Sequence, residues 1–447
     1  VDVVIDGLGQ AHVRYQQSFR RIPVFEGEAI VHVDLASGNV LSVTDALQSF
    51  GPIGLRAALG ADSARAHARE HFNFPAGKHQ EEDEQVIVVD HNVASLAYKV
   101  RFRGDDDGAG PVDRIAIVEA QGRGVLRAWD NVETAAASGT GRGFFNGTVA
   151  LTTNTRSAGG FELRDPTRGG QYTINMNNRT NGGSIFTDAD NTWGDGTLSN
   201  VQTVGVDAQY GTARTWDYYL TVHGRNGIAN DGRGAYNRVH YSRRYNNAFW
   251  SDSCFCMTYG DGDGTTFNPF DSLDVAGHEM SHGVTSRTAN LTYSGESGGL
   301  NEGTSDIFGT MVEYFANNAN DTPDYLIGEK LYKSGNSALR SMIQPSVDGV
   351  SADCWYSGVG SLNVHYSSGV ANHFFYLLAE GTSNGVPSKT CASGNTRVAT
   401  GNGSVAGIGR SAAERIWYRA LTVYMTASTN YAAARTATIS TCSCCAA

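Results

Sequence analysis

Several residue types and sequence features are scarce in this chain of 447 residues. Proline occurs only 9 times, and all 7 cysteines lie at or after Cys254, so the first half has none. No segment approaches the roughly 18 consecutive apolar residues that cross a bilayer. The net charge is −11, and the sequence contains no block of basic residues. We therefore expect neither a membrane span nor a nucleic-acid partner.

The residues that are present indicate a globular, secreted protein. Hydrophobic residues make up 40% and charged residues 18%, which favours a packed core over disorder. The length suggests about three units at roughly 150 residues each. Cysteines clustered in a region rich in Gly, Tyr and Asn predict an oxidising, extracellular environment with a disulfide or two. The odd count leaves at least one thiol unpaired or intermolecular. The start at Val1, with neither an initiator Met nor a signal peptide, indicates a trimmed N-terminus.

The composition changes twice along the chain. Residues 1–133 are rich in Val, Ile, Arg and acids and read as a small α+β region, with a helix over 61–72. The acidic segments 81–84 and 105–108 are expected to be solvated loops. Strands are expected over 29–34, 86–89, 96–103 and 115–118.

The remaining chain changes from strands to helices. Residues 134–143 are small apart from Arg142, and predict an exposed linker and a cleavage site. The next segment, up to about 266, has short strand-like pieces and many turns. Strands first and helices later predict an α+β arrangement. The helical period appears over 272–287, 302–317, 369–381 and 410–427.

An H-E-x-x-H motif carries the chemistry of this sequence. It consists of His278, Glu279 and His282 in a Pro-free segment that Asp271 or Ser272 could cap. Imidazoles at i and i+4 project from one helix face, about 40° apart. This spacing suits one Zn²⁺, with the glutamate beside the open coordination position. The alternative at this stage is a plain helix with two satisfied histidines.

The position of the third ligand distinguishes between the classes of zinc hydrolase that share the H-E-x-x-H motif. The extended motif with a Gly and a further His is excluded, because Thr285 and Thr288 occupy those places. Glu302 lies 20 residues after His282 at the start of the next helical segment, so a returning helix can bring it to the two imidazoles. Asp306, one turn later, can bond the outer nitrogen of a ligating His. Both acids could instead be helix N-terminal residues favoured by the dipole.

Several sequence blocks, which include the H-E-x-x-H motif and Glu302, resemble those of the thermolysin-like neutral metallopeptidases. The resemblance runs nearly end to end from residue 139 to about 438. Residues 10–48, with RYQQSFRRIPV at 14–24, resemble the fungalysin/thermolysin propeptide, and residues 57–133 resemble the PepSY propeptide domain. The blocks that carry the resemblance are YNNAFW at 245–250, YGDGDG at 259–264, DVAGHEMSHGVT at 274–285, GLNE at 299–302 and onward through Glu313, LRSM at 339–342 and NVHYSSG at 363–369.

The resemblance implies an α+β proenzyme with a two-lobed catalytic domain. The expected divisions are a propeptide of two parts (1–48 and 49–133), the 134–143 maturation region, a β-rich lobe with the zinc helix (144–288) and a helical lobe (289–447). The propeptide would act as intramolecular chaperone and inhibitor. We expect a secreted monomer that cleaves protein and peptide substrates.

The resemblance also implies a role for individual residues. Zinc would bind His278, His282 and Glu302, with Glu279 as general base and Tyr293 and His365 as donors to the oxyanion. Asn247, the Ala248 carbonyl and Arg340 would hold the substrate backbone, and Val275, Ile327, Leu331 and Leu339 would form an apolar pocket for Leu, Phe or Ile after the scissile bond. Asp274, Glu313, Asp324 and Glu329 with the Leu326 carbonyl would bind Ca²⁺; a single ion is expected because Leu326 replaces a family acid.

Two motifs and three histidines are interpreted as structural. Gly295-x-Ser297-x-Gly299 matches the serine-hydrolase elbow but is expected in the loop between zinc ligands, without the strand-turn-helix context. The glycine-rich segment 260–264 lacks the closing Glu of an EF-hand loop and is read as a turn. The histidines outside the motif that we expect to be packed or exposed are His223, His240 and His373.

The chain departs from the family at two places. Asn363 stands where many relatives have an Asp that orients the oxyanion histidine, so His365 would be less basic. Relatives continue past Thr438 with another helix, whereas residues 440–447 here are Cys-rich; if that helix is missing, apolar surface near 410–427 is exposed. Spacing does not decide the disulfides; the expected pair is Cys354–Cys391, with Cys254 or Cys256 reaching another partner.

Three functions stay open at this stage. The first is a secreted zinc endopeptidase in zymogen form. The second is a catalytically weak relative that acts as a secreted binding or inhibitory module, although every catalytic residue type is present. The third is a zinc aminopeptidase, which needs an acidic anchor for the substrate amine that the sequence does not show.

Overall fold

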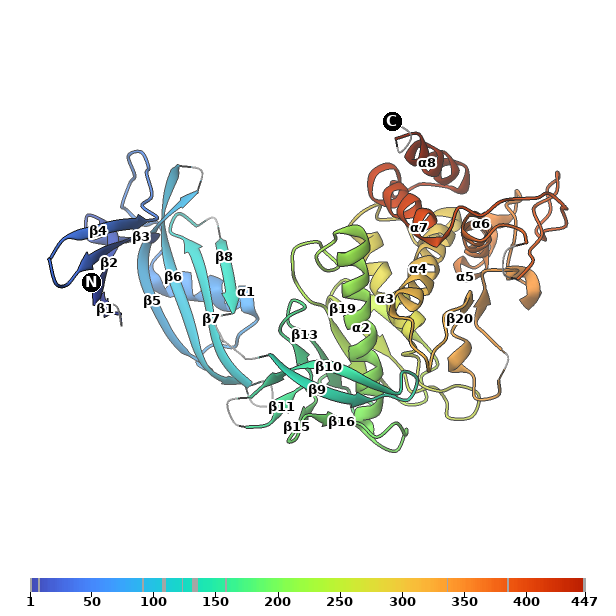
Figure 1. Ribbon diagram of the computed structural model, residues 1–447, viewed down its shortest axis with the longest axis horizontal. Coiled ribbons are helices and arrows are strands. Elements are labelled where there is room, and N and C mark those ends of the chain that lie inside the picture. The colour runs from blue at the N-terminus through green and yellow to red at the C-terminus, as the bar shows by residue number, and fades with distance from the viewer. Residues whose placement is uncertain are drawn as a thin grey trace. The chain divides into compact units, whose positions relative to one another are not determined.

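The computed structural model describes residues 2–6, 9–90, 92–106, 110–122, 124–130, 136–156, 159–335, 337–383 and 386–444. The chain divides into two compact units, Val1–Glu133 and Thr134–Ala447. Figure 1 shows an N-terminal unit built around one sheet and a second unit in which strands give way to helices. In the described part of the chain, no helix has the length and apolar character needed to cross a membrane.

The N-terminal unit is one sheet with a helix on it. The strand order is β1-β2-β3-β5-β6-β7-β8, with β4 paired to β3. Helix α1 packs through Ala64 and Ala68 against Val100, Phe102 and Ala116. The expected helix and four strands are confirmed. The bounds are β1 (Asp2–Ile5), β2 (Gln10–Phe19), β3 (Ile22–Asp34), β4 (Val40–Asp45), α1 (Ala61–Phe72), β5 (Gln80–Asp90), β6 (Val93–Asp106), β7 (Gly110–Glu119) and β8 (Val125–Asp130).

The first acidic segment is a strand rather than the expected loop. Residues 81–84 lie inside β5, where their carboxylates pair with cations from neighbouring elements. Arg65 pairs with Asp83, and Lys99 Nζ lies 2.9 Å from Glu84 Oε1. Paired charges allow an acidic run to stay in a sheet. Of the second acidic segment, residues 105 and 106 lie in β6, and 107–108 fall outside the described residues.

The second unit begins with two sheets. Their orders are β15-β11-β10-β9-β16 and β12-β13-β17-β19-β18, with β14 paired to β13. The bounds are β9 (Ala136–Arg142), β10 (Thr148–Thr155), β11 (Phe161–Glu162), β12 (Arg164–Asp165), β13 (Gln171–Asn175), β14 (Ser184–Ile185), β15 (Thr187–Asp188), β16 (Thr192–Trp193), β17 (Tyr236–Val239), β18 (Ala248–Ser251) and β19 (Cys256–Tyr259).

The prediction of a linker over 134–143 is wrong for residues 136–142, which form β9. This strand pairs with β10 on one side and β16 on the other. Its small residues reflect close packing rather than flexibility. A Cβ on Gly139 would lie 2.5 Å from Asn191 Oδ1, and one on Gly141 2.5 Å from Val206 Cγ1.

Helix α2 (Val201–His223) runs through the region that the sequence predicts as strands and turns. The sequence analysis did not identify this helix, because it contains Gly and Thr residues of low helix propensity. Gly211 permits close contact with the zinc-motif helix, since a Cβ there would lie 2.6 Å from Ala276 Cβ. The hydroxyls of Thr212 and Thr215 donate hydrogen bonds to the backbone carbonyls one turn earlier, at 2.8 Å each. Packing therefore outweighs the low helix propensity of these residues.

The helical lobe confirms the expected helices, with two changes. The helix expected over 410–427 ends at Tyr424. α4 begins at Gly295, earlier than expected, so Gly295-x-Ser297-x-Gly299 forms its first turns rather than a loop. α3 and α4 touch where glycines face each other: a Cβ on Gly277 would lie 3.0 Å from Gly309 Cα. The bounds are α3 (Leu273–Ser286), α4 (Gly295–Ala316), β20 (Leu326–Ile327), η1 (Glu329–Leu331), β21 (Arg340–Ser341), η2 (Pro345–Asp348), η3 (Val359–Ser361), α5 (Val364–Ser367), α6 (Gly369–Ala379), α7 (Arg410–Arg419), η4 (Ala420–Tyr424) and α8 (Tyr431–Cys444).

A closing helix is present, contrary to the expectation from the Cys-rich C-terminus. α8 lies beside α7 in Figure 1, and it buries Tyr431, Ala434 and Ala437 in the same core as Trp417 and Leu421. The expected exposure of apolar surface near 410–427 is therefore wrong for the inward face of that segment.

The cysteine pairing is half as expected. Cys354 pairs with Cys391, which confirms that prediction. Cys254 pairs with Cys256 rather than with a distant partner. The tight turn between β18 and β19 brings these two sulfurs together, because Ser251 and Cys256 are opposite each other in the ladder.

Candidate active site

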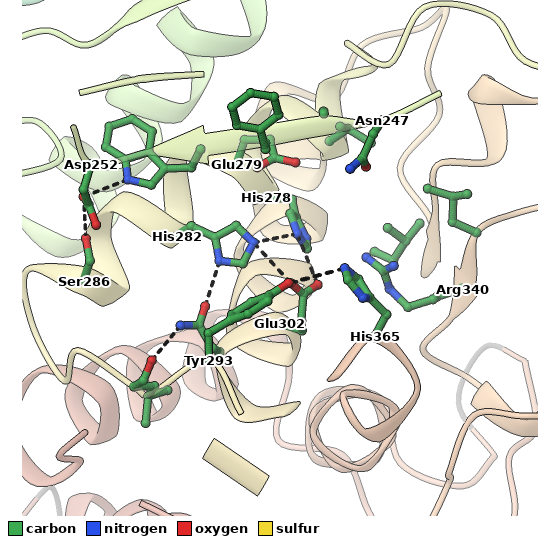
Figure 2. Close-up of a pocket in the computed structure, with 18 of the residues that line it drawn as sticks. Asn247, Asp252, His278, Glu279, His282, Ser286, Tyr293, Glu302, Arg340 and His365 are labelled. Carbon is green, nitrogen blue, oxygen red and sulfur yellow. Dashed lines mark hydrogen bonds and ion pairs between the residues drawn. The ribbon is translucent and has the colours of Figure 1, made fainter. Parts of the chain in front are cut away.

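A cleft of about 630 Å³ lies between strand β18, helices α3 and α4, and the segments that carry Arg340 and His365. Figure 2 shows His278, His282 and Glu302 converging at its centre, below the strand. The edge position of β18 in its sheet leaves one side of that strand facing the cleft. The cleft therefore offers both polar chemistry and a free strand edge.

Three side chains from two helices meet at this centre. His278 Nε2 and His282 Nε2 are 3.0 Å apart. Each lies 3.5 Å from a Glu302 oxygen, His278 from Oε2 and His282 from Oε1. The close α3–α4 packing at the facing glycines brings the carboxylate to the imidazoles.

This cluster fits a zinc ion. Glu302 is 1% exposed, and its Oε2 has no hydrogen-bond partner in the described part of the chain. A buried, unpaired carboxylate oxygen is costly unless a cation neutralises it. Two imidazole nitrogens and one carboxylate oxygen form the ligand set of catalytic zinc sites, which keep a fourth position for water or substrate.

The outer nitrogens of both imidazoles are held by neighbours. His278 Nδ1 lies 2.9 Å from Asp306 Oδ1, and His282 Nδ1 lies 2.7 Å from Asn301 Oδ1. Asp306 also accepts two hydrogen bonds from Arg340, at 2.8 and 2.6 Å. These contacts fix the ring orientation and leave both Nε2 atoms for the metal. Sequence reasoning missed Asn301, whose only signal is its position before Glu302.

The two imidazoles differ in their proton affinity. Burial opposes charge on His278, but the hydrogen bond and charge of Asp306 outweigh it and raise the pKa of His278 to about 9. Burial lowers the pKa of His282 to about 4, despite the charge of Glu302. Burial disfavours the ionised form of Asp306, yet Arg340 and His278 hold the pKa of Asp306 well below its usual range. Asp306 is thus a fixed negative charge behind the site.

Glu279 lines the cleft next to the cluster and is 6% exposed. Burial raises the pKa of Glu279 to about 7, against the opposing charge of His278. A carboxylate with a pKa near the working pH is suited to accept and return a proton.

Tyr293 and His365 face the cluster from the other side of the cleft. The Tyr293 hydroxyl donates to Glu302 Oε1 and lies 3.4 Å from His365 Nε2. Asn363 Oδ1 lies 2.8 Å from His365 Nδ1 and accepts from the His365 backbone N–H at 3.0 Å. Burial lowers the pKa of His365, with the charge of Glu302 opposing. Both side chains direct a polar atom, the Tyr293 hydroxyl and His365 Nε2, toward the ligand cluster.

The substrate side of the cleft has a polar edge and an apolar wall. Asn247 and Ala248 line it from the β18 side, and Arg340 lines it at the same end (Figure 2). Leu331 is fully buried and does not line the cleft. Val275, Ile327 and Leu339 are among the apolar residues that line the cleft.

A second carboxylate cluster lies around the C-terminal end of α4. Oxygens of Glu313, Asp321 and Glu329 all lie within 4.8 Å of one another. Burial, with repulsion from Asp274 and Asp321, raises the pKa of Glu313 to about 11. Burial and Asp274 also raise the pKa of Glu329 to about 9. Sequence reasoning missed Asp321, which lies in the turn after α4 with no motif to mark it.

The other acids expected at that site surround the cluster. Asp274 Oδ2 accepts from the Gly328 N–H at 2.6 Å, and Asp324 Oδ1 accepts from the Leu326 N–H at 2.6 Å. Glu313 Oε2 accepts from the Asp324 N–H at 3.3 Å. The hydrogen bonds connect α3, α4 and the β20 segment around one group of oxygens.

The remaining motifs have structural partners. Ser297 Oγ donates to the carbonyls of Thr292 and Ser294, so it is not a free nucleophile. Asp263 caps the turn that follows it through three backbone N–H groups. The three other histidines contact Tyr418 (His223, stacked at 4.0 Å), Asp261 (His240, 2.8 Å) and the Asp353 carbonyl (His373, 3.0 Å).

Three regions of the chain match known families. Residues 138–286 match the family described as "Thermolysin metallopeptidase, catalytic domain". Residues 289–445 match "Thermolysin metallopeptidase, alpha-helical domain". Residues 1–47 match "Fungalysin/Thermolysin Propeptide Motif".

Curated relatives and a solved structure are similar to the chain. A transglutaminase-activating metalloprotease from Streptomyces mobaraensis is 45% identical over 445 residues, covering 98% of this chain and 57% of the relative, so the chain spans little more than half of that protein. A thermolysin from Alicyclobacillus acidocaldarius subsp. acidocaldarius is 36% identical over 467 residues, covering 97% and 80%. The precursor of protealysin, a metalloproteinase from Serratia proteamaculans, is 27% identical with a TM-score of 0.45, covering 60% and 80%. On its two catalytic-domain matches and its propeptide match, the chain belongs to the thermolysin family of metallopeptidases and carries that family's propeptide motif at its N-terminus.

Proposed function

We propose that the chain is the proenzyme of a secreted zinc endopeptidase. The observation that carries this proposal is the convergence of His278, His282 and Glu302 on one point beside Glu279. Zinc held by the three ligands would bring the pKa of a bound water close to neutrality. Glu279 accepts the proton from the attacking water and passes it to the leaving amine.

Tyr293 and His365 supply hydrogen-bond donors where the carbonyl oxygen of the substrate becomes negative. Both lie within reach of one Glu302 oxygen, which supports a common target beside the ligand cluster. Donors fixed before the reaction stabilise the developing charge without reorganisation.

The substrate backbone pairs with the free edge of β18 through Asn247 and the Ala248 carbonyl, as an added strand. The residue after the scissile bond enters the apolar end formed by Val275, Ile327 and Leu339, with Leu331 behind that wall. A bulky apolar residue is preferred there. Two nitrogens of Arg340 are bonded to Asp306, which leaves Nη1 for a substrate carbonyl.

One Ca²⁺ binds the second cluster. Its ligands are Glu313, Asp321 and Glu329 with Asp274, Asp324 and the Leu326 carbonyl. Hard oxygen donors from several segments suit Ca²⁺. The support is electrostatic: Lys330 Nζ, 3.5 Å from Asp321 Oδ1, is the one lysine or arginine ion pair that the described structure gives these carboxylates.

Residues 1–133 form the propeptide, in two parts (1–48 and 49–133), and maturation removes them from a monomeric enzyme. The cut falls before Ala136, because β9 pairs with strands on both sides and its loss would open that sheet. The PepSY-like character of the second part remains a prediction.

Hydrolysis of an internally quenched peptide with one apolar residue after the scissile bond tests the proposed function. The mature enzyme should cleave it, and a zinc chelator or Glu279→Ala should abolish cleavage. Ser297→Ala is the matched control and should stay active, since Ser297 bonds only to backbone carbonyls. Undiminished hydrolysis by Glu279→Ala, with its folding checked by circular dichroism, would refute the proposal.

A further inference from the structure

The end of the cleft beyond His282 carries a carboxylate that the proposed reaction does not use. Asp252 lines this end together with Trp250 and Ser286, and its side chain is 54% exposed. Figure 2 shows Asp252 and Ser286 on one side of the zinc ligands and Arg340 on the other. The cleft therefore has a carboxylate at one end and a guanidinium at the other.

The hydrogen bonds of Asp252 converge on one of its two oxygens. Oδ1 accepts from Trp250 Nε1 at 2.9 Å and from Ser286 Oγ at 3.0 Å. The Arg287 guanidinium also donates to Oδ1. In the described part of the chain no donor is bonded to Oδ2. Burial works to raise the pKa of Asp252, but the bonds from Arg287, Trp250 and Ser286 outweigh it and lower the pKa, so the group is ionised at neutral pH.

Arg287 pairs with Asp252 but lies outside the lining of the cleft. Its guanidinium lies over the rings of Phe255 and Trp250, with Cζ 4.7 and 5.7 Å from their centroids. Arg287 is not among the residues that line the cleft, whereas Asp252 is. A side chain entering this end meets the carboxylate first.

The turn that carries Asp252 is held in one conformation. The disulfide Cys254–Cys256 closes it between β18 and β19. Phe255 takes the left-handed conformation at φ 54° and is 5% exposed, packed against Trp250 and under Arg233 at 4.6 Å. A positive φ at a non-glycine residue persists only where the surroundings fix it. A fixed carboxylate binds its partner at a small cost in conformational entropy.

The proposed function sets the direction of the substrate, and this inference rests on it. A substrate antiparallel to β18, with the residue after the scissile bond near Arg340, extends its preceding residues along Trp250 toward Asp252. Trp250 lies two positions after Ala248, and a strand advances about 3.3 Å per residue. Asp252 is thus reached by a side chain roughly two to three residues before the scissile bond.

We propose that Asp252 makes the enzyme favour substrates with Lys or Arg about two to three residues before the scissile bond. The carboxylate oxygen Oδ2 receives the cationic group of the substrate. A partly exposed ion pair of this kind changes kcat/KM by about fivefold, and the preference weakens as ionic strength rises.

Two substitutions with opposite expected signs test the proposal. The substrates are a pair of quenched peptides that differ only in Lys or Gln at the chosen position, and the readout is the ratio of their kcat/KM values. Asp252→Asn should lower the Lys/Gln ratio to near one. Arg287→Met, which keeps the apolar packing and removes the competing cation, should raise the ratio above that of the unaltered enzyme. A destabilised site would not move the two variants in opposite directions.

The control and the outcomes separate this proposal from the proposed function. Asp190→Asn removes a carboxylate that is exposed and remote from the cleft, and should leave the ratio unchanged. Hydrolysis of the Gln peptide reports the peptidase activity itself. A ratio that stays constant in Asp252→Asn, or that falls in both variants while the Gln peptide is cleaved, overturns the role of Asp252. If neither peptide is cleaved by the unaltered enzyme, the proposed function fails and this inference fails with it.

Discussion

The helix pair α3–α4 carries two buried carboxylate clusters that are balanced in different ways. Around the His278–His282–Glu302 cluster, Asp306 is bonded to His278, Arg340 and Asn372, so its charge is compensated by the protein. Around Glu313 the carboxylates face one another. Their raised pKa values reflect burial and mutual repulsion.

This difference assigns the two clusters different tasks. A compensated cluster keeps its geometry through protein contacts alone and can be tuned for chemistry. An uncompensated cluster opposes folding until a cation arrives, so binding of the cation adds directly to stability. Metal removal should therefore affect mainly activity at the first cluster and mainly stability at the second.

The largest expected effect comes from selective metal removal. A zinc chelator should abolish peptide hydrolysis. It should lower the thermal unfolding midpoint less than a calcium chelator does, because Asp306, Asn301 and Arg340 still hold the ligands. A calcium chelator should lower the free energy of unfolding by about 2–3 kcal/mol, the linkage expected for a ligand near 100 times its Kd. Calorimetry and activity assays on the same samples check this. Equal loss of stability with both chelators would contradict the comparison.

The next effect concerns the charge behind the zinc ligands. Asp306→Asn removes the negative partner of both His278 and Arg340 and should weaken zinc binding by about 10- to 100-fold. Asn301→Ala removes the neutral partner of His282 and should weaken it less. Zinc affinity measured by competition with a chromogenic chelator separates the two. An equal loss in both variants would show that the charge of Asp306 is not what matters.

The sequence predicted the part of the first cluster that has a regular spacing, whereas Glu313 and Glu329 of the second cluster were expected only from the family resemblance. His278, Glu279 and His282 follow from the helical period, and Glu302 from the returning helix. Asn301 was missed because its contact with His282 depends on how α4 packs against α3. Asp321 was missed because its role depends on how the turn after α4 folds back, which no periodicity encodes. Asp321 in particular contacts Glu313 and Glu329 only after the chain between α4 and β20 has folded over α4.

Elements with small residues were the other source of error. Residues 136–142 were predicted as a linker and form β9, because glycine there permits close packing against Asn191 and Val206. Helix α2 was missed for the same reason, because its Gly211 permits close packing against α3. Flexibility and tight packing favour the same residues, so composition alone does not separate them.

The third prediction sharpens the contrast through pH. The carboxylates of Glu313 and Glu329 have folded pKa values raised above those of the unfolded chain, so the folded state binds more protons. The stability of the calcium-free protein should therefore fall as pH rises from below the unfolded pKa of about 4.5 toward 9. Calcium should remove most of this slope, because the bound cation favours the ionised form.

A substitution provides the matching control. Glu313→Gln should stabilise the calcium-free protein at pH 8 relative to the unaltered chain by about 1 kcal/mol and destabilise the calcium-saturated one. Urea unfolding at pH 5 and pH 8, with and without calcium, measures all four values. A pH slope that persists unchanged in Glu313→Gln would mean that another group causes it.

The smallest expected effect tests whether the compensated cluster can be retuned by one charge. His365 is oriented by the amide of Asn363, whose Oδ1 lies 2.8 Å from Nδ1 but carries no charge. Asn363→Asp would favour the protonated imidazole and raise the pKa of His365, by about one unit for an adjacent carboxylate. Because the protonated ring is the better donor to the oxyanion, the alkaline limb of the kcat/KM profile should move to higher pH in the variant. Identical alkaline limbs in the two proteins would show that the proton of His365 does not control that limb.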